Sequence, residues 1–359
     1  MYRKKQVEMN ILFDRIVLSG DHVYVTRRYN MQYRKLGQSD LEATVIGLGT
    51  WAIGGDSQWG HSDDRTSIYA IQEAIDQGIT LIDTAPAYGL GHSEEVVGKA
   101  IEGKRHDVVL ASKCGLIWDN TEGCALLMHR DGVDVCRNLA AGSIIEQVER
   151  TLKRLNTDYL DVLLTHWQAV PPNQTPIEET MDAMNRLIEQ GKIRAVGACN
   201  VTPEQIRTYA SCGKIAVIQQ KYSMLDRTVE QNGVMDTCEE LGITFQAYSP
   251  LERGLLTGKV TMQTEAVGNA KKSLRFYAPE ERRKVLAMLE EFKPLCEKYE
   301  TSMASLVIAW TVARKPYMSV LCGARKPEQV SDNAAGGSLI LEQEDLEKID
   351  GLSAWAMEA

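Results

Sequence analysis

The sequence LIDTAPAYG occupies residues 81–89, and the rest of the chain repeats its pattern. An apolar, β-prone run ends in Asp83, and a short loop then carries Tyr88 in front of a glycine. Two later β-prone runs end in the same way, VVLAS before Lys113 and YLDVLLT before His166. An acid at a strand end and a phenol on the following loop can meet in one pocket. We therefore treat Asp83, Tyr88, Lys113 and His166 as one constellation.

Short β-prone runs alternate with amphipathic helical runs from residue 45 onward. Proline after threonine, at Pro176 and Pro203, is a strong helix-start signal, and Ser143 with Glu146 predicts a capping box. The predicted strands are 45–49, 80–83, 108–113, 159–167, 193–199, 216–222, 244–249 and 319–323. Eight strand-then-helix units without a domain-sized linker favour a single-domain parallel (β/α)8 barrel over an open doubly wound sheet.

Catalytic groups of such a barrel lie at the C-terminal ends of its strands. The residues at or near the predicted strand ends are Asp83, Lys113, His166, Asn200, Gln219, Tyr248 and Gly323. Two connections, 114–142 and 250–279, are too long to be plain turns. We expect these two segments to form lids or pocket walls beside the strand ends.

Composition excludes several classes of protein. The net charge of −9 argues against nucleic-acid binding, which needs excess Lys and Arg. The eight cysteines form no CxxC pair, so they predict neither a zinc site nor a disulfide framework, but reduced thiols in the cytoplasm. No apolar run is long enough to span a membrane. A small-molecule partner fits best, and the oligomeric state stays open.

The first thirty residues differ from the rest of the chain. A basic start at Arg3 is followed by an apolar stretch that Asp14 and Arg15 interrupt, which is not the pattern of a signal peptide. Met31 opens a much more regular sequence. We expect residues 1–30 to be an N-terminal extension and residues 31–359 to form the barrel domain.

The constellation suggests acid catalysis. A free phenol has a pKa near 10, and we expect the Lys113 ammonium to lower the pKa of Tyr88 while Asp83 keeps the ammonium charged and aimed. Such a phenol can protonate a carbonyl oxygen as a hydride reaches the carbon. His166 would then point a ring nitrogen at the same oxygen.

Six separated motifs resemble those of the aldo-keto reductases and occur in the same order as in that family. They are LIDTAPAYG at 81–89, VVLASKCG at 108–115, LLTHW at 163–167, GACN at 197–200, YSPLERGLLTG at 248–258 and GARKPEQVSDN at 323–333. The resemblance runs from about Leu36 to the C-terminus. It is nearest to the bacterial branch that reduces small aldehydes such as methylglyoxal or acts on sugar-like carbonyls.

The resemblance implies a (β/α)8 barrel that uses NADPH, with NADH possible, to interconvert a small aldehyde or sugar-like carbonyl and its alcohol. It implies that Tyr88 is the general acid, supported by Asp83, Lys113 and His166. Asn200 and Gln219 are similar to residues that hold the nicotinamide carboxamide, and Tyr248 to the aromatic that stacks on the ring. The other implied cofactor residues are Thr50, Trp51, Asp83, Ser249, Leu251, Gly254, Leu256, Gly323, Arg325, Gln329 and Asn333.

Two departures from the family pattern concern the cofactor. Cys199 stands where a serine is common in the family, so one carboxamide hydrogen bond is expected to be weakened or lost. Gly323 and Gln329 stand where NADP-preferring members often have Lys and Arg, although Arg325 and Lys326 still offer cations to a 2′-phosphate.

The substrate pocket is expected to include Trp51, Trp118, Trp167 and Arg253, because aromatic residues on loops and strand ends can line a small pocket. Two other functions are open. One is a cofactor-sensing regulatory or binding subunit with a reductase fold. The other, a metal-dependent hydrolase, would need grouped His and carboxylate ligands, and the six histidines show no such spacing, so no metal site is predicted.

Overall fold

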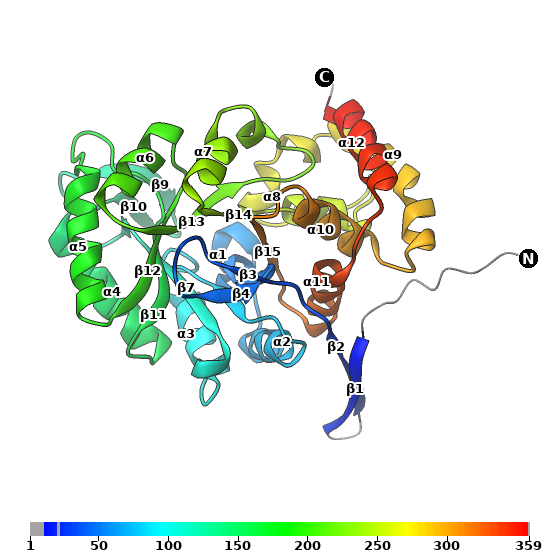
Figure 1. Ribbon diagram of the computed structural model, residues 1–359, viewed down its shortest axis with the longest axis horizontal. Helices are drawn as coiled ribbons and strands as arrows, with labels where there is room; N and C mark the ends of the chain where they lie inside the picture. Colours follow the sequence, from blue (N-terminus) through cyan, green and yellow to red (C-terminus); the bar gives the residue numbers. More distant parts are fainter. Residues whose placement is uncertain (1–10, 20–21, 358–359) are drawn as a thin grey trace, which may run out of the picture.

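The computed structural model describes residues 11–19 and 22–357, with side chains from residue 29 onward. Eight parallel strands close into a barrel, in the order β11-β12-β13-β14-β15-β5-β6-β7 (Figure 1). They are β5 (Ile46–Gly49), β6 (Leu81–Asp83), β7 (Val109–Cys114), β11 (Leu160–Thr165), β12 (Ile193–Cys199), β13 (Ile215–Lys221), β14 (Thr244–Tyr248) and β15 (Met318–Gly323). Pairing of Val320 with Ile46 joins the last strand to the first. The predicted (β/α)8 barrel is confirmed.

Helices surround the barrel (Figure 1). After β5 to β7 come α2 (Asp64–Asp76), α3 (His92–Ala100) and α4 (Ala141–Leu155), and after β11 to β13 come α5 (Ile177–Glu189), α6 (Pro203–Cys212) and α7 (Val234–Leu241). The last strands are followed or preceded by α9 (Pro279–Lys298), α10 (Met303–Ala313), α11 (Pro327–Ser338) and α12 (Gln343–Met357). Apolar side chains of strands and helices form one continuous core between the two layers.

One predicted helix start is confirmed and another is wrong. Thr202 caps α6 with a complete capping box, because its hydroxyl accepts from the Gln205 amide and the Gln205 side chain accepts from the Thr202 amide. The capping box predicted at Ser143 is wrong. Helix α4 begins two residues earlier, where Asn138 accepts from the backbone of Ala140, and Ser143 instead accepts a hydrogen bond from Gln147.

The N-terminal end of the barrel is closed. Strands β3 (Tyr33–Lys35) and β4 (Glu42–Thr44) form a hairpin. Leu36, Leu41 and Ala43 from this hairpin pack with the residues that fill the barrel interior. The opposite end of the barrel carries the polar residues Asp83, Lys113 and His166, at or next to the ends of β6, β7 and β11.

The two long connections leave from that end. The first contains a three-stranded sheet in the order β8-β10-β9, formed by β8 (Leu116–Ile117), β9 (Ala125–Arg130) and β10 (Val133–Arg137). The second contains η4 (Glu252–Thr257), α8 (Asn269–Lys272) and η5 (Arg275–Tyr277). Both segments therefore contain helices or strands of their own, which is compatible with the expected role as pocket walls beside the strand ends.

The N-terminal segment forms a separate ribbon. Strands β1 (Ile11–Ser19) and β2 (His22–Tyr29) pair only with each other and extend away from the barrel beside α2 and α11 (Figure 1). The first ten residues of the expected extension lie outside the described residues. Among the described helices, none combines the length and apolar character needed to cross a bilayer.

Candidate active site

A buried ion pair joins two neighbouring strands at the open end of the barrel. The Lys113 Nζ atom lies 2.7 Å and 2.8 Å from the two carboxylate oxygens of Asp83, and it also donates to the Thr84 carbonyl at 3.0 Å. Both side chains are almost fully buried, at 1% and 3% exposure. Burial lowers the pKa of Lys113, but Asp83 and Tyr88 outweigh it and leave the pKa above its ordinary value. The ammonium is therefore charged at neutral pH.

Tyr88 lies on the loop after β6, over this ion pair. The centre of its ring is 4.9 Å from Lys113 Nζ, and the ring meets His166 edge-on at 5.7 Å. Burial raises the pKa of Tyr88 to about 12, while Lys113 acts in the opposite direction. Lys113 lowers the pKa of Tyr88, as expected, but the loss of water around the hydroxyl is the larger effect, so the net shift is upward and not downward. The phenol keeps its proton at neutral pH.

His166 follows β11 and is held at its backbone, where its amide donates to the Cys114 carbonyl at 2.8 Å. Burial, followed by the charges of Lys113 and Arg130, holds the pKa of His166 well below 6.5. The imidazole is therefore neutral at neutral pH, and one of its nitrogens can donate a hydrogen bond to an oxygen in the pocket.

Arg130 at the end of β9 is a site residue that sequence reasoning missed. Its side chain is 5% exposed; Nη2 donates to the carbonyl of Ala87, next to Tyr88, and Nε lies 3.7 Å from Asp56. It therefore ties the first long connection to the Tyr88 loop and adds positive charge near His166. No strand-end pattern marks it, because it lies inside that connection.

The residues expected at the nicotinamide are connected to the tetrad formed by Asp83, Tyr88, Lys113 and His166. Asn200, with a left-handed φ of 55°, donates from Nδ2 to the His166 carbonyl and accepts from the Tyr248 hydroxyl, both at 2.9 Å. Gln219 Nε2 donates to Asp83 Oδ2 at 2.9 Å. The buried Cys199 thiol lies 3.7 Å from Gln219 Oε1, so it can donate a weak hydrogen bond there.

The second long connection begins with an unusual backbone. Ser249, Arg253 and Gly254 have φ values of 59°, 54° and 96°, in the left-handed region. Glu252 between them is fully buried, and its carboxylate accepts from Ser223 at 2.6 Å. Leu256 is also buried, whereas Leu251 is only partly so. These buried side chains hold the loop in a conformation in which η4 departs from helical geometry at Arg253 and Gly254.

The remaining expected cofactor residues lie on both sides of the barrel mouth. The hydroxyl of Thr50 is buried and donates to the Asp83 carbonyl at 2.9 Å. At the start of α11 the Arg325 amide donates to the Gln329 side chain at 2.8 Å, and Asn333 donates to the Gly323 carbonyl at 3.5 Å. These bonds fix the shape of residues 323–333 at the end of β15.

The expected pocket residues fall into two groups. The centre of the Trp51 ring lies 6.3 Å from that of Tyr88, and the Arg253 guanidinium lies 5.4 Å from the Trp51 ring. Trp118 and Trp167 pack instead on an apolar cluster formed by Ala87, Leu116 and Val135. Trp59, which packs edge-on against Trp51 at 5.2 Å, was not predicted.

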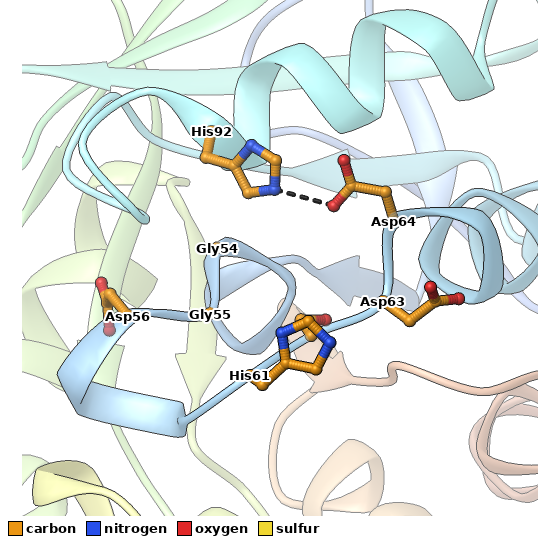
Figure 2. Close-up of a pocket in the computed structure, with 8 residues that line it drawn as sticks. Gly54, Gly55, Asp56, His61, Asp63, Asp64 and His92 are labelled. Atoms are coloured by element: carbon orange, nitrogen blue, oxygen red, sulfur yellow. Dashed lines mark hydrogen bonds and ion pairs between the residues drawn. The ribbon is translucent and has the colours of Figure 1, made fainter.

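A cavity of about 500 Å³ lies beside Gly54, a residue that packs closely against the backbone of Tyr88 and Gly89. It is lined by Gly54, Gly55, Asp56, His61, Ser62, Asp63, Asp64 and His92. Figure 2 shows His92 and Asp64 joined across it, at 2.8 Å. No group of three potential metal ligands lies together in the part of the chain that the structure describes.

Barrel, site and sequence define one class of protein. A model of the aldo/keto reductase family matches residues 45–354, so the chain belongs to that family, as the six motifs predicted. It is an NAD(P)H-dependent oxidoreductase that acts on carbonyl groups.

Individual relatives are similar over nearly their whole length. The chain is 43% identical to the NADH-specific methylglyoxal reductase of Escherichia coli K12, over 86% of this chain and 94% of that protein. The glycerol dehydrogenase AKR11B4 of Gluconobacter oxydans superposes with a TM-score of 0.79 at 34% identity, covering 91% and 96% of the two chains. An aldo/keto reductase of Klebsiella pneumoniae, solved with NADP and acetate, gives a TM-score of 0.64 at 28% identity, covering 87% and 92%.

The buried ion pair generates a stability prediction. Lys113→Met leaves the Asp83 carboxylate buried without its cation, so we expect a loss of about 3–5 kcal/mol in the free energy of unfolding. The double variant with Asp83→Leu should lose clearly less than the sum of the two single variants. Urea denaturation of the four proteins measures this difference.

The exposed pair Arg207–Glu240, with N–O distances of 2.8 Å and 2.7 Å, is the matched control. Its double-mutant cycle should give a coupling of about 1 kcal/mol or less. Additive losses at Asp83 and Lys113 would contradict the interpretation of this pair.

Proposed function

We propose that the protein reduces a small aldehyde or sugar-like carbonyl to its alcohol, or catalyses the reverse, with Tyr88 as the proton donor. The observation that carries the proposal is the position of the Tyr88 ring, with its centre 4.9 Å from Nζ of the buried Lys113, which is paired with Asp83. A neutral His166 beside the same ring supports it. The regulatory-subunit alternative has less support: a relative from Arabidopsis thaliana named a probable voltage-gated potassium channel subunit beta is 28% identical, against 43% for the methylglyoxal reductase.

The residues present fit a nicotinamide cofactor, because amide groups of Asn200 and Gln219 lie beside the tetrad and offer both donors and acceptors. The bound cofactor supplies the hydride that reduces the carbonyl carbon. Tyr88 gives its proton to the carbonyl oxygen, and the charge of Lys113 stabilises the phenolate that remains. His166 donates a hydrogen bond to that oxygen and orients the carbonyl. One hydride and one proton convert the carbonyl into the alcohol.

Small, uncharged substrates such as methylglyoxal are favoured by the aromatic walls. Trp51 lies beside Tyr88, and Trp118 and Trp167 border the connection that carries Arg130. The Escherichia coli relative that is named a methylglyoxal reductase supports the same substrate class.

Replacing Tyr88 by Phe tests the proton donor. Phenylalanine keeps the ring but lacks the hydroxyl, so we expect kcat for methylglyoxal reduction to fall about 10²- to 10⁴-fold. The cofactor Kd, from fluorescence titration, should stay within about twofold. Retained turnover in Tyr88→Phe would contradict the assignment of Tyr88 as the proton donor. A wild-type protein that binds cofactor tightly but reduces no aldehyde in a broad panel would favour the regulatory subunit.

The preferred cofactor is proposed to be NADPH. Arg325 and Lys326 lie at the start of α11. Burial lowers the pKa of Lys271 in α8, and the nearby charge of Arg325 lowers it further. Cations gathered in this way favour a bound phosphate. The Klebsiella pneumoniae structure contains NADP, whereas the Escherichia coli relative is named NADH-specific, so NADH is the competing choice.

Arg325→Ala tests this preference. Loss of a charge-assisted hydrogen bond should lower kcat/KM for NADPH by about 10- to 100-fold, with little change for NADH. Steady-state assays with both cofactors measure the ratio, and Arg207→Ala, far along the chain on the exposed surface of α6, serves as the charge-matched control. Equal efficiency of the wild type with NADH and NADPH would contradict the proposal.

The domain boundary is a further part of the proposal: residues 1–30 are an extension, and residues 31–359 are the reductase domain. In support, β1 and β2 pair only with each other, and the family match begins at residue 45. A chain starting at Met31 should keep its thermal midpoint within a few degrees and its kcat/KM within about twofold. Insolubility or loss of activity would show that the ribbon belongs to the domain.

A further inference from the structure

Gln246 is a buried polar residue that belongs to none of the six motifs. It lies on β14, two residues before Tyr248, and is 2% exposed. Its Oε1 atom accepts a hydrogen bond from Gln219 Nε2 at 2.8 Å. The same amide nitrogen donates to Asp83 Oδ2 at 2.9 Å. Gln246 is thus connected to the tetrad through a single intervening side chain.

The two acceptors, Asp83 Oδ2 and Gln246 Oε1, determine how the Gln219 amide is oriented. A carboxylate oxygen only accepts hydrogen bonds, so the nitrogen of Gln219, not its oxygen, must face Asp83. With one hydrogen on Asp83 and the other on Gln246, both donors of this amide are used. Its Oε1 is left on the side of the Cys199 thiol, 3.7 Å away. A carbonyl oxygen in this place is the acceptor that a carboxamide N–H group needs.

The same arrangement affects the ion pair. Asp83 Oδ2 accepts from both Lys113 and Gln219, at 2.8 Å and 2.9 Å. Without Gln246, one Gln219 hydrogen has no acceptor in a buried site, and Asp83 alone holds the amide, which can then turn about that one bond. The orientation of Gln219 therefore depends on two residues, of which only Asp83 lies in a motif.

We propose that Gln246 is a positioning residue of the reductase: it fixes the Gln219 amide, so that Gln219 presents its oxygen to the cofactor carboxamide while bonding to Asp83. This inference rests on the proposed function, because it assigns Gln219 to the nicotinamide. The Gln246 side chain bonds to Gln219, and it acts on Asp83 and on the cofactor subsite through Gln219.

Gln246→Met tests the proposal, because methionine has a similar length but offers no comparable acceptor. We expect the Kd for NADPH to rise about 3- to 10-fold, the effect of losing one neutral hydrogen bond, and kcat to fall by a similar factor. The KM for methylglyoxal should stay within about twofold. Gln246→Glu keeps an oxygen at the same position and, assayed at pH 6, should restore most of the NADPH affinity.

Ser319→Ala is the matched control. Ser319 lies beside Gln246 in the register of β14 and β15, is equally buried, and its hydroxyl has no hydrogen-bond partner among the described residues. Its removal perturbs the same layer of the barrel without touching Gln219, so NADPH affinity and kcat should not change.

If Gln246→Met does not fold, Gln246→Asn replaces it, because the shorter amide stays polar but withdraws its oxygen from Gln219. Unchanged NADPH affinity in these variants would overturn the proposal, as would equal effects of Ser319→Ala or of Gln246→Glu. The Kd is measured without turnover. A wild type that binds NADPH but reduces no carbonyl would refute the proposed function while the Gln246 comparison still gives its result.

Discussion

The ion pair between Asp83 and Lys113 is the constraint on which the rest of the site depends. Its charges are almost completely removed from water, and separating them would leave an uncompensated buried charge. They come from β6 and β7, whose register pairs Asp83 with Ala111, two residues before Lys113. The barrel therefore cannot shift these strands without breaking the pair, and the fold and the site stabilise each other.

The charge of Lys113 also affects the pKa values of its neighbours. It opposes the rise in the pKa of Tyr88 and contributes to the low pKa of His166, although burial is the largest cause for both. The result is a neutral phenol and a neutral imidazole beside a charged ammonium. This combination suits a site that must donate a proton to a carbonyl oxygen and then stabilise the phenolate.

The sequence predicted the barrel and the tetrad because both leave local patterns. Several β-prone runs end in or just before a polar residue, and residues such as Lys113 and His166 could be placed at the barrel mouth from this pattern. The predicted capping box at Ser143 failed because Asn138 and the preceding loop start α4 earlier. A local motif does not reveal which of two nearby starts the tertiary contacts favour.

The sequence by itself thus determined the order of strands, the residues at their ends and the membership of the aldo/keto reductase family. Only the tertiary structure decided that burial outweighs Lys113 in setting the pKa of Tyr88, that Arg130 reaches the Tyr88 loop, and that Gln246 orients Gln219. The physical reason is that burial and hydrogen bonding depend on neighbours far apart in sequence. Periodicity and strand ends, in contrast, are local properties of the chain.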